Sequence, residues 1–147
     1  MTLLANAFGP GSLAIVTSLG NRTEAIKLAG DLLQESGRVQ EEYVSSMIDA
    51  VDKFGPYIVI APGIALAHGK PEEGVIETGM SLVVIREPLA FGHGENDPVE
   101  LVFGLAAKDH SSHIQLMAEL ATFLGDSEKV NSLLQAGNLV QLRSRLV

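Results

Sequence analysis

The sequence predicts a layered α/β or α+β domain in which helices cover a central β-sheet. Three observations support this prediction: short apolar runs that are typical of buried strands, amphipathic segments with helical spacing, and the alternation of the two along the chain. A length of 147 residues and a hydrophobic content of 46% suit one compact unit with its own core. We therefore expect residues 1–147 to form a single domain.

The N-terminal half contains one predicted strand and two predicted helices. Residues 12–17 (SLAIVT) form a short apolar run between glycines, which favours a buried strand. Asn21 and Glu24 have the spacing of a helix N-cap and its N3 partner, and apolar residues then recur at helical intervals until Gly37. A second amphipathic stripe over 40–54 predicts another helix, which a Gly-Pro pair ends.

Three further apolar segments predict strands over residues 57–61, 80–85 and 100–107. Each is bounded by Gly, Pro, Asn or Asp, and each lacks the polar alternation of a half-exposed strand. We therefore expect fully buried strands in a central sheet, in an order that the sequence leaves open.

The C-terminal third predicts a long helix and two shorter ones. The long helix begins at Asp109 or at Ser112, both of which are good N-cap residues. Its apolar face is expected to contain Leu116, Met117, Leu120, Ala121 and Leu124. Counting back by the same spacing places His113 and then His110 on that face. Asp126 can cap a further helix, and a short amphipathic segment follows it.

Composition excludes several kinds of site and partner. The absence of cysteine excludes disulfides, thiolate chemistry and Cys-ligated zinc. A formal charge of −8 disfavours nucleic acids and acidic membrane surfaces, and it favours basic protein partners. The apolar N-terminal run has no preceding basic segment and is broken by AFGPGS at residues 7–12. We expect a cytoplasmic protein that is not inserted into the membrane and binds no nucleic acid.

His68 is the first candidate for chemistry. It ends an apolar segment and is followed at once by Gly69 and Lys70. Near pH 7 imidazole can act as a neutral nucleophile and hold a transferred group on nitrogen. Gly69 lacks a Cβ, so backbone N–H groups could approach a ligand there, and Lys70 adds a positive charge. The alternative is a buried histidine that is hydrogen-bonded to a backbone carbonyl.

His113 is a second candidate, in the first turn of the predicted long helix. Unpaired N–H groups and the helix dipole attract anions there, so His68 and His113 could together bind a phosphoryl group. His113 could instead be a residue at the edge of the core, or it could bind a metal together with His110 and a third ligand. His93 lies in a turn-rich segment, and we expect it to be exposed rather than catalytic. No P-loop, nucleophile-elbow or dinucleotide-binding motif is present.

Two short motifs occur in the order and spacing of a known family. The first is a small-apolar run that ends in His-Gly, Ala65 to Gly69, and the second is Ser112-His113-Ile114. With the segments around them, from about residue 21 to the C-terminus, the sequence resembles enzyme IIA domains of the bacterial sugar phosphotransferase system. The resemblance is to the mannitol/fructose/nitrogen superfamily and is strongest to its ascorbate-type branch. The family usually has proline where this chain has Ala67.

This resemblance implies a three-layer α/β sandwich with a mixed central sheet and helices on both faces. It also implies a phosphotransferase system IIA component, in which His68 accepts a phosphoryl group from the phosphocarrier HPr. His68 would pass the group to a IIB component, which carries a cysteine acceptor in the ascorbate branch and works with a membrane IIC component. His113 would stabilise the phosphoryl group, and Gly69, Lys70 and Ser112 would bind it, with no cofactor or metal.

Transport of L-ascorbate or a related sugar acid or polyol is the function that the resemblance favours. A regulatory module, in which phosphorylation of His68 changes binding to a sensor or transcription partner, stays an alternative. A metal-dependent hydrolase that uses His68, His110 and His113 is a third possibility.

Overall fold

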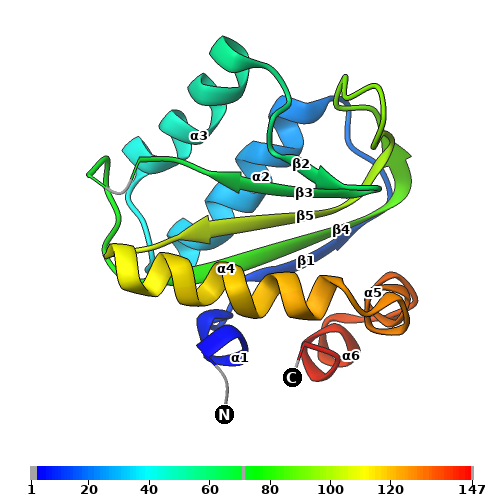
Figure 1. The fold of residues 1–147 in the computed structure, drawn as a ribbon. Helices are drawn as coiled ribbons and strands as arrows, with labels where there is room; N and C mark the ends of the chain where they lie inside the picture. The colour runs from blue at the N-terminus through cyan, green and yellow to red at the C-terminus, as the bar shows by residue number, and fades with distance from the viewer. Residues whose placement is uncertain (1–2, 71, 147) are drawn as a thin grey trace.

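A five-stranded mixed sheet forms the centre of the part of the chain that the computed structural model describes, residues 3–70 and 72–146 (Figure 1). The strand order is β1-β4-β5-β3-β2. β1 is parallel to β4 and β3 is parallel to β5, whereas β4–β5 and β2–β3 are antiparallel. The strands are β1 Leu13–Val16, β2 Val59–Ala61, β3 Ile64–His68, β4 Gly79–Leu89 and β5 Val99–Ala106.

Helices cover both faces of this sheet, which confirms the predicted sandwich (Figure 1). One face is covered by α2 and α3, and the other by α1, α4, α5 and α6. The helices are α1 Leu3–Ala7, α2 Arg22–Glu35, α3 Glu41–Phe54, α4 His110–Leu124, α5 Ser127–Leu134 and α6 Leu139–Ser144. Within the described residues, no helix is both long enough and apolar enough to cross a membrane.

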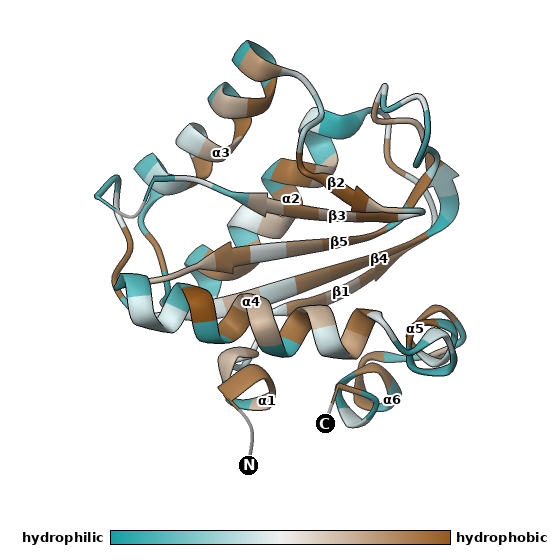
Figure 2. Ribbon diagram, viewed as in Figure 1, coloured by the Kyte–Doolittle hydropathy of each residue, from teal (hydrophilic) through white to brown (hydrophobic). Residues whose placement is uncertain are grey.

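The sheet separates two hydrophobic cores. Along β5, Leu101, Phe103 and Leu105 pack in the cluster beneath α4, whereas Val102 and Ala106 pack in the cluster beneath α2 and α3. Successive side chains of a strand point to opposite faces, so a strand covered on both sides is apolar at nearly every position. The strands accordingly form a continuous hydrophobic layer between helices with polar outer surfaces (Figure 2). Burying each large apolar side chain contributes about 1.5–3 kcal/mol.

Side-chain caps mark where α2, α4 and α5 begin. Asn21 Oδ1 accepts from Glu24 N–H at 3.0 Å, so α2 begins at the predicted residue. Asp109 Oδ1 accepts from Ser112 N–H at 2.7 Å, which identifies Asp109 rather than Ser112 as the N-cap of α4. Asp126 caps α5 in the same way. These bonds satisfy N–H groups that have no partner inside the helix.

The prediction of one fully buried strand over 57–61 is wrong. That region contains only the three-residue edge strand β2, in which Ile60 is 45% exposed. The chain then reverses at Gly63, whose φ is +77°, and returns as β3. Gly63 tolerates this left-handed conformation because it has no Cβ. The turn consists of Pro62 and Gly63, and the segments on both sides of it are apolar. The apolar pattern therefore does not distinguish two paired strands from one.

Two helical details also differ from the predictions. α1 was not predicted, and it packs against α4, where Leu4 N–H donates to Glu119 Oε1 at 3.0 Å. On α4 the buried residues are Leu116, Leu120 and Phe123, whereas Ala121 is exposed. The i, i+4, i+7 spacing of the buried residues follows the helical repeat of 3.6 residues per turn, which carries position 121 out of the contact.

Candidate functional site

A pocket of about 410 Å³ opens beside His68 at the carboxyl end of β3. β2 pairs with β3 only near Ile64 and Ala65, so β2 does not cover the edge of β3 at His68. One side of α3 forms the facing wall. The described lining residues are Ser46, Asp49, Ala50, Lys53, Phe54, Tyr57, His68, Gly69, Lys70 and Glu73.

The ring of His68 is held from two sides. Its Nδ1 lies 3.1 Å from the carbonyl oxygen of Leu66. Because a carbonyl only accepts hydrogen bonds, Nδ1 donates in this contact, and in the neutral ring the lone pair is therefore on Nε2. The ring of Tyr57 packs edge-to-face against the imidazole, with centroids 5.7 Å apart and planes at 89°. The contact with a backbone carbonyl is the one expected for a buried structural histidine. His68 is only half-buried, however, so its ring also remains accessible from the pocket.

Gly69 is held closely by the protein itself. Its N–H donates to Tyr43 Oη at 2.9 Å. A Cβ at this position would meet Ser46 Oγ and would lie 3.2 Å from Tyr43 Cε1. Neighbouring side chains therefore favour glycine here, in addition to any need for a ligand to approach.

Tyr43 contributes to the site although no sequence motif points to it. It is 2% exposed, and its hydroxyl donates to the carbonyl of Leu105 at 2.6 Å. Burial raises the pKa of Tyr43 to about 12, while the hydrogen bond from Gly69 and the nearby Tyr57 have smaller effects. In the sequence, Tyr43 lies next to the apolar stripe of α3, and no local signal distinguishes it from a core residue.

Two lysines line the pocket, together with the carboxylates of Asp49 and Glu73. Lys53 and Lys70 both contribute to its lining, and both are exposed. Lys53 Nζ lies 5.3 Å from the centroid of the Phe54 ring, and neither lysine forms an ion pair with a described residue. The two ammonium groups are therefore available to an anion that enters the pocket.

The motif that contains Ser112 and His113 lies at the same end of the sheet as His68. β3 and β5 are parallel, and His68 pairs in register with Leu105 near the end of β5. The start of α4 follows directly and lies beyond these strand ends (Figure 1). His113 is half-buried in the first turn of α4. No hydrogen bond joins it to His68 among the described residues, and it is not among the residues that line the pocket.

The remaining histidines lie apart from this pocket. His110 is exposed, and His93 is half-buried rather than exposed as predicted. His93 Nδ1 accepts from Asn96 N–H at 3.1 Å in a loop that the Asp97 carboxylate closes. In the part of the chain that is described, no three or more His, Asp or Glu side chains form a group that could hold a metal ion. His68, His110 and His113 therefore do not form a metal triad.

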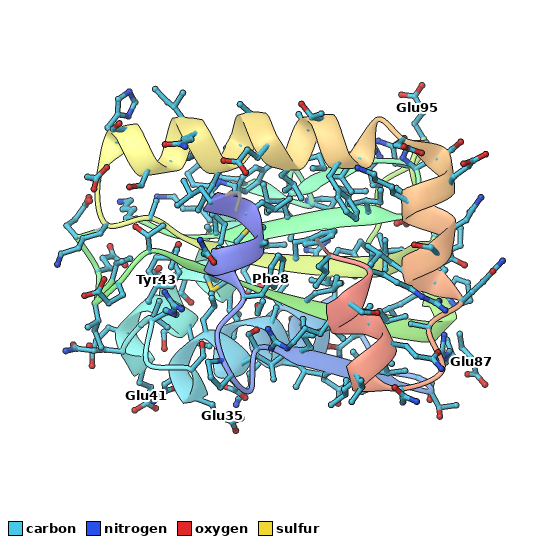
Figure 3. The ribbon with its side chains drawn as sticks, turned by 90° about the horizontal axis from the view of Figure 1, so that it is seen from below. Phe8, Glu35, Glu41, Tyr43, Glu87 and Glu95 are labelled. Carbon is cyan, nitrogen blue, oxygen red and sulfur yellow. The ribbon has the colours of Figure 1, made fainter. Side chains whose placement is uncertain are left out.

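The surface around the sandwich is acidic. Acidic residues outnumber basic residues by 18 to 10. Glu35, Glu41, Glu87 and Glu95 project outward at the periphery (Figure 3). The unpaired ammonium groups in the pocket can bind an anionic group, while the acidic surface around it attracts a basic protein.

Comparisons with known proteins agree with this architecture. The sequence model of the family described as "Phosphoenolpyruvate-dependent sugar phosphotransferase system, EIIA 2" matches residues 11–146. The Ascorbate-specific PTS system EIIA component of Escherichia coli (strain K12) is 42% identical over 111 residues, which are 75% of this chain and 72% of that protein.

Solved structures of the same kind superpose over nearly the whole chain. The mannitol-specific cryptic phosphotransferase enzyme IIA CmtB from Escherichia coli has a TM-score of 0.88 and 32% identity, and 97% of each chain is covered. Enzyme IIA of mannitol from Escherichia coli, in its complex with phosphorylated enzyme IIB, has a TM-score of 0.81 and 28% identity, with 94% of this chain and 95% of that chain covered. The chain belongs to the EIIA family of the phosphoenolpyruvate-dependent sugar phosphotransferase system.

Proposed function

We propose that His68 is the phosphorylated residue of this EIIA component, and that it receives a phosphoryl group from phospho-HPr and passes it to a IIB cysteine. The observation that carries the proposal is the position of one imidazole. His68 ends β3 at the rim of a pocket that Lys53 and Lys70 line, and its Nδ1 contacts the Leu66 carbonyl, so Nε2 is the nucleophilic atom.

The transfer needs no chemistry beyond nucleophilic displacement at phosphorus. In the first step the lone pair of Nε2 forms the new P–N bond, and the bond from phosphorus to the donor breaks with its electron pair on the donor. In the second step a thiolate of the IIB component attacks phosphorus, and the P–N bond to Nε2 breaks. The Leu66 carbonyl keeps its hydrogen bond to Nδ1 throughout and so stabilises the charge that develops on the ring.

Charge and donors around Nε2 would stabilise the phosphoryl oxygens. Lys70 and Lys53 line the same pocket, and ammonium groups lower the free energy of an anionic transition state. Ser112 and His113 lie in the first turn of α4, where the helix dipole also favours an anion. We assign phosphoryl binding to Lys70, Ser112 and His113, and assign to Gly69 the close packing that exposes the ring.

The transported sugar is proposed from the relatives. The Escherichia coli protein that is 42% identical is described as ascorbate-specific, which supports L-ascorbate or a related sugar acid, and the mannitol-specific structural relative keeps a polyol as the alternative. In this scheme the chain acts in the cytoplasm, together with a IIB protein and a membrane IIC component.

The test is reconstitution of the relay with purified enzyme I, HPr and phosphoenolpyruvate. The native chain should gain one acid-labile phosphate, and ³¹P NMR should place it on Nε2. His68→Ala should gain none, whereas His93→Ala, which removes an imidazole remote from the pocket, should be labelled like the native chain. Label that persists in His68→Ala contradicts the assignment. Transfer onward to a IIB cysteine distinguishes the transport role from the regulatory alternative.

A further inference from the structure

We propose that Tyr43 is a positioning residue for the reactive histidine, because its hydroxyl group is inserted between the ends of β3 and β5 and sets the backbone at His68 and Gly69. This inference rests on the proposed role of His68. It is based on the hydrogen bonds at the end of the β3–β5 ladder, which differ from those of a regular parallel pair.

The ladder between β3 and β5 has a defined pattern. Leu101 N–H donates to the carbonyl of Gly63, one position before the pairing partner of Leu101, at 3.0 Å. In a parallel ladder, a residue that donates in this way also accepts from the position after its partner, and the role recurs at every second residue. Leu105, whose partner is His68, has the same role. The regular pattern therefore predicts a bond from Gly69 N–H to the Leu105 carbonyl.

Tyr43 replaces that bond with two others. Gly69 N–H donates to Tyr43 Oη at 2.9 Å, and Tyr43 Oη donates to the Leu105 carbonyl at 2.6 Å. A direct N–H···O=C link thus becomes a longer N–H···O–H···O=C link. The hydroxyl oxygen links the two backbone groups immediately after the His68–Leu105 pair, and both groups stay satisfied.

The insertion is tightly enclosed and uses a neutral hydroxyl. Tyr43 is 2% exposed, and a Cβ on Gly69 would lie 3.2 Å from its ring. Because burial raises the pKa of Tyr43 to about 12, the hydroxyl stays protonated and can donate and accept at the same time. The geometry therefore specifies a tyrosine at 43 and a glycine at 69 together.

The consequence for the site lies in the geometry of His68. Its backbone is anchored on one side by the ladder and on the other by the bond from Gly69 to Tyr43, while its ring is anchored to the Leu66 carbonyl. A small displacement of a reacting atom from its productive position lowers the rate strongly. Tyr43 therefore acts on the rate through the position of the ring, without contact with the phosphoryl group.

The experiment compares Tyr43→Phe with a matched control in the full chain. Ser81→Ala is the control, because Ser81 is also buried and its Oγ donates to a backbone carbonyl, that of Ala29, at 2.7 Å. For transfer from phospho-HPr, Tyr43→Phe should lower kcat about tenfold and leave KM within about twofold of the native value. The Gly69 amide and the His68 imidazole ¹⁵N resonances should also move. Ser81→Ala should lower the melting temperature with native kcat and native resonances.

Two results overturn the inference: a native kcat in folded Tyr43→Phe, or unchanged Gly69 and His68 resonances. If the native chain takes up no phosphate, the proposed function fails, and the resonances alone decide whether Tyr43 positions His68. If Tyr43→Phe does not fold, 3,5-difluorotyrosine at position 43 keeps the ring but makes the hydroxyl more acidic. Transfer should then fall with rising pH where the native rate is constant, and identical pH profiles would refute the positioning role.

Discussion

The Nδ1 atom of His68 lies 3.1 Å from the carbonyl oxygen of Leu66, two residues earlier on the same strand. This local contact selects the tautomer of the neutral ring, because the carbonyl can only accept, and it leaves the lone pair on Nε2, the atom that we propose as the nucleophile. Changes that reorient the ring should therefore slow phosphoryl transfer without removing the nucleophile.

Tyr57→Ala should slow transfer, since the Tyr57 ring packs edge-to-face on the imidazole. Aromatic pairs of this kind contribute about 0.5–1.5 kcal/mol, which corresponds to a loss of roughly twofold to tenfold in rate. Tyr57→Phe keeps the ring and should retain most of the rate in a single-turnover assay with phospho-HPr. If Tyr57→Phe is as slow as Tyr57→Ala, the hydroxyl rather than the ring contact matters.

Lys53→Met and Lys70→Met should each lower the transfer rate, because both ammonium groups line the pocket and neither is paired with a described carboxylate. Loss of one cation near a developing phosphoryl charge should cost about tenfold. Lys27→Met is the matched control: Lys27 pairs with Asp31 on α2 at 2.7 Å, outside the pocket lining. A native rate in both pocket variants would show that the lysines do not contact the phosphoryl group.

Asp109→Ala should fray the start of α4, because it removes the acceptor for Ser112 N–H. The melting temperature should fall by a few degrees, and transfer should slow if His113 takes part. Asp126→Ala removes the corresponding cap of α5 and should lower the melting temperature while the rate stays native. If Asp109→Ala and Asp126→Ala transfer phosphate at the same rate, the ordered start of α4 does not contribute to the reaction.

The cap of α4 should also persist in mild acid. The hydrogen bond from Ser112 N–H lowers the pKa of Asp109 below its ordinary value of 3.8. A lowered folded-state pKa adds stability that is present above the ordinary pKa and is lost as the pH falls through the folded value. The difference in stability between native and Asp109→Ala protein should therefore decrease only below about pH 3.8, in acid denaturation monitored by circular dichroism.

Tyr43 should make the fold sensitive to alkali. Burial raises its pKa from 10.0 to about 12. A raised folded-state pKa adds stability that is complete below pH 10 and is lost as the pH rises to about 12. Two pKa units correspond to about 3 kcal/mol in the free energy of unfolding. Tyr43→Phe should lack this loss in urea titrations at successive pH values, whereas Tyr57→Phe should show it.

Features that depend on nearby residues were predictable from the sequence. The caps at Asn21, Asp109 and Asp126 join side chains to N–H groups two or three positions away, so their spacing is visible in the chain. The hairpin between β2 and β3 was missed because both of its strands are apolar, and only the two-residue turn Pro62-Gly63 separates them.

By itself, the sequence determined the alternation of helices and strands, the apolar segment that ends in His68, and the family to which its motifs point, because each of these is written in local order and spacing. Only the tertiary structure decided that α3 faces the open edge of β3, that Lys53 and Lys70 share a pocket with His68, and that the hydroxyl of Tyr43 lies between Gly69 and Leu105. The two hydrogen bonds of the Tyr43 hydroxyl join residues that are 26 and 62 positions apart in the sequence. They can form only after the sheet has brought the ends of β3 and β5 together.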